Sequence, residues 1–293
     1  MHDAQEQLEQ GVTHQTAGRL AEALDCYRIA GESAAEPEVR VEALRRQAIV
    51  HYMRAEWDAA LDAAARASEI ARDAALPDQV AEAVNVKAMV HQARGEFDVA
   101  VTLYEQILGM TANDRVRGAA LQNLGSIAAQ RGDFKTARTQ FQSSHECFRR
   151  AGYLRGEAVL LNNFARAAVD AGNFMVAVDL MRQAMAAAKR LGDAELTALT
   201  TMNYAEALAG RRDFDKADEL VREALEHFTT SRNAWRQVEC MRLLGDIHRD
   251  RGDREAASRF YGDALAVASE IGAQADVELL RNRQAALVPA SGN

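Results

Sequence analysis

A short turn signal recurs seven times along the 293-residue chain, and this recurrence restricts the possible folds more than any other feature. In its clearest form a glycine is followed by an acidic or polar residue and then an aromatic, as in Gly132-Asp133-Phe134. The last residues of the seven signals lie 37 or 40 positions apart: Leu20, Trp57, Phe97, Phe134, Phe174, Phe214 and Arg254. This period predicts an array of repeats in which each unit packs only against its neighbours.

Residue size follows the same frame. Three positions after each signal stands an alanine: Ala23, Ala60, Ala100, Ala137, Ala177, Ala217 and Ala257. Nine positions before each stands another small residue: Gly11, Ala48, Ala88, Gly125, Ala165, Ala205 and Gly245. Seven positions after, a bulkier side chain is usual, as at Tyr27, Phe141 and Tyr261. The pattern predicts pairs of helices that cross closely, with a small residue facing a large one.

The composition and the periodicity predict an all-α fold. Hydrophobic residues make up 48% of the chain and aromatics only 6%, so alanine and leucine, which are good helix formers, supply most of the apolar surface. Phe134, Ala137 and Phe141 fall on one helical face, and no run shows the alternation typical of a strand. We expect fifteen helices, with turns near residues 18, 55, 95, 132, 172, 212 and 252.

The order of small, turn, aromatic and alanine positions resembles the tetratricopeptide repeat (TPR) family, with long units similar to those of kinesin light chain, Pins-type adaptors and bacterial Rap/PlcR-type proteins. The resemblance implies a right-handed α-solenoid of seven helix hairpins. The predicted units are about 3–36, 37–76, 77–112, 113–152, 153–192, 193–232 and 233–273. A capping helix is expected at 274–288, and residues 289–293 should fray.

In this family the first helix of each hairpin lines the concave wall, and here amides gather on the predicted first helices of the middle units. Asn123, Asn163 and Asn203 each lie eleven positions before a signal residue. Such a ladder resembles the one that holds the backbone of an extended peptide in kinesin light chains, since a carboxamide both donates and accepts. The predicted peptide-binding residues are Asn85, Gln122, Asn123, Asn162, Asn163, Arg166 and Asn203. The alternative is that these amides only fix the hairpins.

Other polar groups have more ordinary interpretations. Basic Arg45, Arg242 and Arg249 share the predicted inner wall with acidic side chains such as Glu82 and Asp246, and we expect many of these to neutralise one another. Four histidines lie six positions before a signal residue: His14, His51, His91 and His248. Packed helices lie about 8–10 Å apart, which is too far for ligands of one zinc ion. We therefore predict no metal site, no cofactor and no catalytic residues.

Charge and cysteine usage bound the function. A net charge of -8 opposes binding of nucleic acid along the whole surface. No signal peptide or span of 18 apolar residues is present, so we expect no membrane insertion. The three cysteines show no metal-binding or disulfide spacing, so we expect a cytoplasmic protein. The alanine- and arginine-rich usage suggests a bacterial source.

The predicted function is a protein- or peptide-binding adaptor or scaffold that uses the concave groove, and not an enzyme. One alternative is a regulatory peptide sensor that acts through a separate effector protein, because Rap/PlcR-type receptors carry an effector domain before their repeats and this sequence begins its first repeat almost at once. The other alternative is a structural scaffold that forms homo-oligomers.

Overall fold

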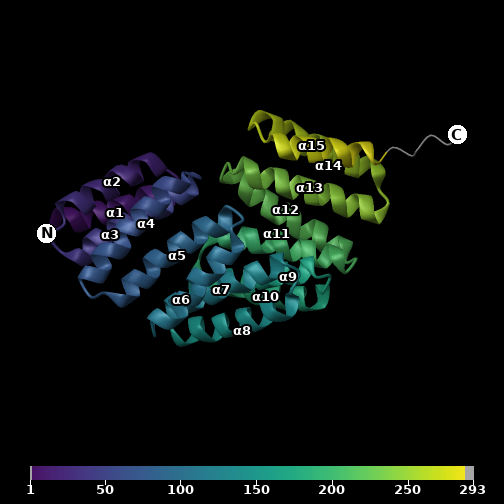
Figure 1. The fold of residues 1–293 in the computed structure, drawn as a ribbon. Helices are drawn as coiled ribbons and strands as arrows, with labels where there is room; N and C mark the ends of the chain where they lie inside the picture. The colour runs from purple at the N-terminus through teal and green to yellow at the C-terminus, as the bar shows by residue number, and fades with distance from the viewer. Residues whose placement is uncertain (1, 288–293) are drawn as a thin grey trace. The chain divides into compact units, whose positions relative to one another are not determined.

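The computed structural model describes residues 2–287, with side chains from residue 4 onward, and this part of the chain contains fifteen α-helices and no strand (Figure 1). The fold class predicted from the sequence is confirmed. The helices are α1 (His2–Thr16), α2 (Leu20–Ser33), α3 (Pro37–Met53), α4 (Trp57–Asp73), α5 (Pro77–Ala93), α6 (Phe97–Met110), α7 (Asp114–Gln130), α8 (Phe134–Arg150), α9 (Leu154–Asp170), α10 (Phe174–Leu191), α11 (Ala194–Gly210), α12 (Phe214–Thr230), α13 (Ala234–Arg251), α14 (Arg254–Glu270) and α15 (Gln274–Ala285).

The helices fall into two compact units. Unit 1 comprises residues 1–153 and holds α1 to α8, and unit 2 comprises residues 154–293 and holds α9 to α15. In each unit an odd-numbered helix pairs with the next to form a hairpin, and each hairpin packs on the following one. The segment predicted as a cap contains α15, which packs on α14, whereas the predicted frayed tail at 289–293 lies outside the described residues.

Each turn signal marks the start of a second helix. The seven signal residues from Leu20 to Arg254 are the first residues of α2, α4, α6, α8, α10, α12 and α14. Just before them the backbone takes a positive φ at every predicted turn, including 57° at Ala55 and 65° at Arg212. At Gly132 this conformation lets the Asp133 N–H bond the Ala128 carbonyl at 2.9 Å, which closes the end of α7.

Two short second helices explain the two spacings of 37. Both α2 and α6 have 14 residues, whereas the other second helices have 17 or 18. After α6 the chain becomes extended at Thr111, and the Asn113 side chain then caps α7 by accepting from the Arg115 N–H at 3.0 Å. The missing residues amount to about one helical turn.

The core is built as the size pattern predicts. The seven alanines that follow the turn signals are all fully buried. A Cβ added to Gly125 would lie 2.8 Å from the Phe141 ring, and Gly11 and Gly245 face the Tyr27 and Tyr261 rings in the same way. A large ring on one helix therefore needs a small residue on its partner. None of the described helices combines the length and the apolar character needed to cross a membrane.

Candidate functional site

The first helices of the hairpins form a continuous wall within each unit. In unit 1, α1 contacts α3, α3 contacts α5 and α5 contacts α7, and in unit 2, α11 contacts both α9 and α13. Successive second helices contact one another less in both units. Each unit is therefore narrower on its first-helix side. We call this surface the inner wall of the unit, and all seven predicted site residues lie on helices of the inner walls.

In unit 1 the inner wall presents three of the predicted amides, all partly exposed: Asn85 on α5 and Gln122 and Asn123 on α7. Asn85 Nδ2 lies 3.5 Å from the Met89 sulfur, and Asn85 Oδ1 is buried without a hydrogen-bond partner among the described residues. An unpaired buried acceptor of this kind costs roughly 1–3 kcal/mol. A ligand that donates a hydrogen bond to this oxygen would remove that cost, once the amide turns its oxygen toward the surface of the wall.

Asn123 lies against the Tyr104 hydroxyl of α6. That hydroxyl donates to Gln92 Oε1 at 3.0 Å. Burial raises the pKa of Tyr104, and a hydrogen bond with Asn123 opposes this rise only in part. The Asn123 amide is thus partly used in packing between hairpins and remains partly exposed on the wall.

In unit 2 two of the predicted amides are brought together. Asn162 on α9 is 5% exposed and Asn203 on α11 is 3% exposed, and Asn203 Nδ2 donates to Asn162 Oδ1 at 2.9 Å. Asn163 is partly exposed and Arg166 is exposed on the same face. The buried pair holds α9 to α11, so the accessible predicted groups of this wall are Asn163 and Arg166.

Charged side chains of the walls pair with one another, as the sequence predicts. In unit 1 Arg45 contacts Glu42 at 2.6 Å and Glu82 at 3.1 Å. In unit 2 Asp246 accepts from Arg242 at 3.2 Å and from Arg249 at 3.0 Å. Because these charges neutralise one another, little net charge remains at these positions to bind a charged ligand.

Glu206 is an exception on the wall of unit 2. Within the described residues its carboxylate makes no ion pair. Burial raises its pKa, and the charges of Arg242 and Arg166 counter this rise only in part.

The four histidines contact the turn that follows each of them. His51 Nδ1 lies 2.6 Å from Glu56 and His91 Nδ1 lies 2.5 Å from Glu96, while His14 Nδ1 accepts from Arg19 at 2.9 Å. His248 lies 2.9 Å from Asp218 and 3.6 Å from Asp253. The side chains described here hold no cluster of three or more histidine, cysteine or acidic groups suited to a metal ion.

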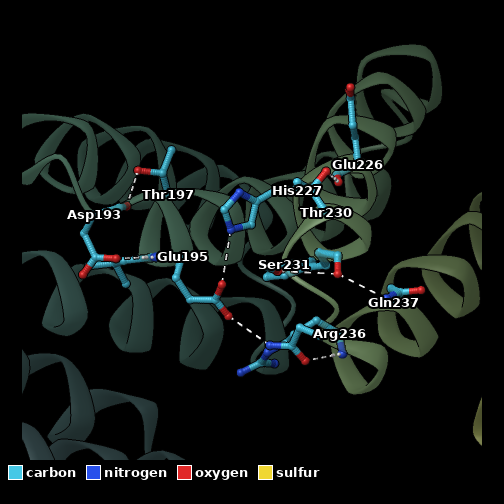
Figure 2. A network of polar contacts seen from close by, with 12 residues as sticks. Asp193, Glu195, Thr197, Glu226, His227, Thr230, Ser231, Arg236 and Gln237 are labelled. Carbon is cyan, nitrogen blue, oxygen red and sulfur yellow. Dashed lines mark hydrogen bonds and ion pairs between the residues drawn. The ribbon is translucent and has the colours of Figure 1, made fainter. Parts of the chain in front are cut away.

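A polar network links three helices of unit 2 and is seen in Figure 2. His227 Nε2 on α12 lies 3.2 Å from Glu195 on α11. Asn233, just before α13, donates to the same carboxylate at 3.0 Å. Asp193 caps α11 by accepting from the Leu196 N–H at 2.9 Å. A hollow of about 330 Å³ beside His227 is lined mainly by small residues such as Ala198 and Ala224. The polar groups of this network hydrogen-bond to one another and so connect neighbouring helices.

A second hollow, on unit 1, was not predicted from the sequence. It measures about 160 Å³ and joins the inner wall to the turn after α8. Its lining residues are Arg45, Glu82, Asn85, Arg115, Val116, Ala119 and Tyr153. Only Asn85 among them was a predicted site residue. Arg115 and Tyr153 lie 38 positions apart, outside the repeat positions that form the amide ladder, so the ladder gave no sign of them.

An array of antiparallel helix pairs with polar inner walls defines a helical-repeat protein. A family model described as "Tetratricopeptide repeat" matches residues 116–190 and 191–270, which is more than half of the chain. The chain therefore belongs to the tetratricopeptide repeat family, and the family predicted from the sequence is confirmed. A comparison with curated proteins found no match.

Solved structures similar to the chain include two Rap proteins. The apo form of RapI is 17% identical with a TM-score of 0.65, and the match covers 92% of this chain and 98% of that one. A Rap protein complexed with Competence and Sporulation Factor is 16% identical with a TM-score of 0.64, covering 93% and 76%. A signal transduction ATPase from Pyrococcus horikoshii with a tetratricopeptide repeat sensor is 16% identical with a TM-score of 0.68, covering 92% and 41%. At these identities the likeness shows the fold.

Proposed function

We propose that the chain is a binding protein that holds an extended peptide, or an extended segment of a partner protein, along its inner walls. The observation that carries this proposal is the Asn85 amide, whose buried oxygen lacks a partner while its neighbours on the wall are partly exposed. A carboxamide satisfies both ends of a peptide group without requiring a particular side chain, so a row of amides suits a backbone. The proposed role is binding, without catalysis and without a cofactor.

The proposed contacts divide into accessible and buried groups. On the inner wall of unit 1, Asn85, Gln122 and Asn123 hold a ligand backbone. On the inner wall of unit 2, Asn163 does so, and the exposed Arg166 pairs with an acidic group of the ligand. The buried pair of Asn162 and Asn203 supports the site by fixing the spacing of α9 and α11.

The proposal predicts separate effects for the two groups of amides. An ordinary hydrogen bond contributes about 0.5–1.5 kcal/mol, so replacing Asn85, Asn123 and Asn163 together by alanine should weaken binding by about 1.5–4.5 kcal/mol. The melting temperature should fall less than in Asn203→Ala, because all three side chains are partly exposed, although Asn123→Ala also removes the hydrogen bond with the Tyr104 hydroxyl. The measurement is affinity capture from a native lysate, followed by titration of the captured partner with wild type and variant. If the triple variant binds with undiminished affinity, these amides do not contribute to binding.

A control comes from the buried pair. Asn203→Ala should lower the melting temperature while the accessible amides remain in place. Loss of binding in the triple variant, together with a larger loss of stability in Asn203→Ala than in the triple variant, supports the division. We also assign the chain to the cytoplasm in this proposal, because its three cysteines are free and buried, as suits a reducing compartment.

A regulatory peptide sensor is the second candidate. The observation in its favour is the likeness in fold to a Rap protein that was solved in complex with Competence and Sporulation Factor. In that case binding of a peptide should change the affinity of the chain for a second protein. Titration of a captured protein partner with and without the bound peptide distinguishes a sensor from a simple adaptor. Extensive self-association on a sizing column would favour a homo-oligomeric scaffold instead.

A further inference from the structure

The hollow of unit 1 contains a cationic group that no neighbour neutralises. The Arg115 guanidinium at the start of α7 makes no hydrogen bond or ion pair with any described residue, and the side chain is exposed. Its central carbon lies 4.4 Å from the centre of the Tyr153 ring. Stacking on an aromatic ring restricts the guanidinium and leaves its N–H donors free at the edge.

The other two charged side chains that line this hollow are Arg45 and Glu82. They are 3.1 Å apart and neutralise each other. Arg115 is therefore the excess positive group of the hollow. Its five N–H donors match a carboxylate, which can accept two of them at once.

A neutral amide lines the hollow beside this cation. Asn85 Oδ1 is buried and lacks a donor, and Asn85 is one of the lining residues together with Val116 and Ala119. A ligand that offers an N–H group and a carboxylate a few atoms apart would place the carboxylate on Arg115 and the N–H beside the Asn85 amide, which would accept it after turning its oxygen toward the hollow. An aspartate or glutamate within a peptide has this arrangement, since its backbone N–H stands beside its acidic side chain.

We infer that this hollow is a specificity subsite that accepts an acidic side chain of the bound segment, with Arg115 binding the carboxylate and Tyr153 orienting Arg115. The inference rests on the proposed peptide-binding function. It adds that the chain prefers peptides with an acidic residue at one position. The volume of about 160 Å³ suits a single side chain. A subsite of this kind reads one position of the ligand, whereas the amides hold its backbone.

The chain supplies a matched control for Arg115. Arg155 stands 40 positions later, at the same place in the next repeat, but its guanidinium is paired with Asp193 at 2.5 Å. Both arginines are exposed, so replacing either by glutamine changes the net charge equally. Only Arg115 has free donors on the hollow, and only Arg115→Gln should affect recognition of an acid.

The test is a selection from a library of random linear peptides displayed on phage, made in parallel with the wild-type chain and with Arg115→Gln, Arg115→Glu and Arg155→Gln. Wild type and Arg155→Gln should enrich peptides with aspartate or glutamate at one fixed position. Arg115→Gln should lose this preference, and Arg115→Glu should prefer lysine or arginine there. Melting temperatures of all variants are measured beside the selection.

A wild-type peptide is then titrated with its acidic residue intact and changed to the amide. We expect the change to weaken binding to wild type by about 10- to 100-fold, as for a charge-assisted hydrogen bond, and to have little effect on binding to Arg115→Gln. Peptides that bind without an acidic preference, or that bind wild type and Arg115→Gln alike, would overturn the subsite and leave the proposed function standing. If no peptide binds any of the proteins, both are refuted.

Discussion

Gly125→Ala adds one methyl group, which has two opposing effects on the stability of the chain: higher helix propensity and overpacking of the core. Alanine is a better helix former than glycine by about 0.5–1 kcal/mol, so the change would stabilise α7 if nothing stood nearby. In the structure the added Cβ lies 2.8 Å from two carbons of the Phe141 ring and 3.1 Å from a third. Ordinary contacts between carbon atoms are about 3.5–4.0 Å. The ring, which is 1% exposed, must therefore move within a packed core.

Overpacking of this kind costs about 1–3 kcal/mol, which exceeds the gain in helix propensity. We expect Gly125→Ala to lower the free energy of unfolding by about 0.5–2 kcal/mol. Gly109 is the control, because it lies near the end of α6 and no atom stands within 4 Å of its added Cβ. Gly109→Ala should leave stability unchanged or raise it slightly.

The assay is urea unfolding followed by far-ultraviolet circular dichroism. A repeat array does not always unfold in one step, so midpoints and slopes are both compared with those of wild type. The double variant Gly125→Ala with Phe141→Leu should recover part of the loss if the clash with the ring causes it. If Gly125→Ala stabilises the chain as much as Gly109→Ala, the Phe141 ring does not pack closely on Gly125, and the reasoning is refuted.

Three further outcomes are expected. Asn203→Ala should lower the free energy of unfolding by about 1–3 kcal/mol in urea titration, because it leaves the buried Asn162 oxygen unpaired, and an unchanged midpoint would contradict the pair. The hydrogen bond from His91 lowers the pKa of Glu96, so its stabilisation is present above the ordinary glutamate pKa of about 4.3 and is lost as the pH falls through the lowered value. NMR titration of wild type and His91→Ala should show the Glu96 pKa rising in the variant. Burial raises the pKa of Cys240 to about 12, so a thiol reagent at pH 8 should modify it only after unfolding, and rapid modification of the native chain would refute the burial.

The start of every second helix could be predicted from the sequence, because local chemistry fixes it. A residue able to adopt a positive φ, followed by the first residue of a helix, is a short-range signal that does not depend on distant contacts. The small residue at Gly125 and the ring at Phe141 were also predictable as partners, because every hairpin repeats the same crossing and so repeats the same sizes.

The lengths of α2 and α6 became clear only in the structure. The sequence shows two spacings of 37, but it does not say which helix is shorter. The structure shows that α2 and α6 are the shorter helices. After α6, Thr111 and Asn113 hydrogen-bond to Asp78 in place of the usual turn.

For the candidate site, the sequence determined which residues are amides and which helices bear them, and the tertiary structure decided what each amide faces. Asn162 and Asn163 are adjacent in sequence, yet the first is buried against Asn203 and the second is partly exposed. Neighbouring helical residues point about 100° apart, so a small rotation of α9 against α11 decides which of them meets the next helix. Arg115 and Tyr153 likewise come together only through the packing of α7 and α8, because contact between distant residues depends on how helices are placed and not on the period within one helix.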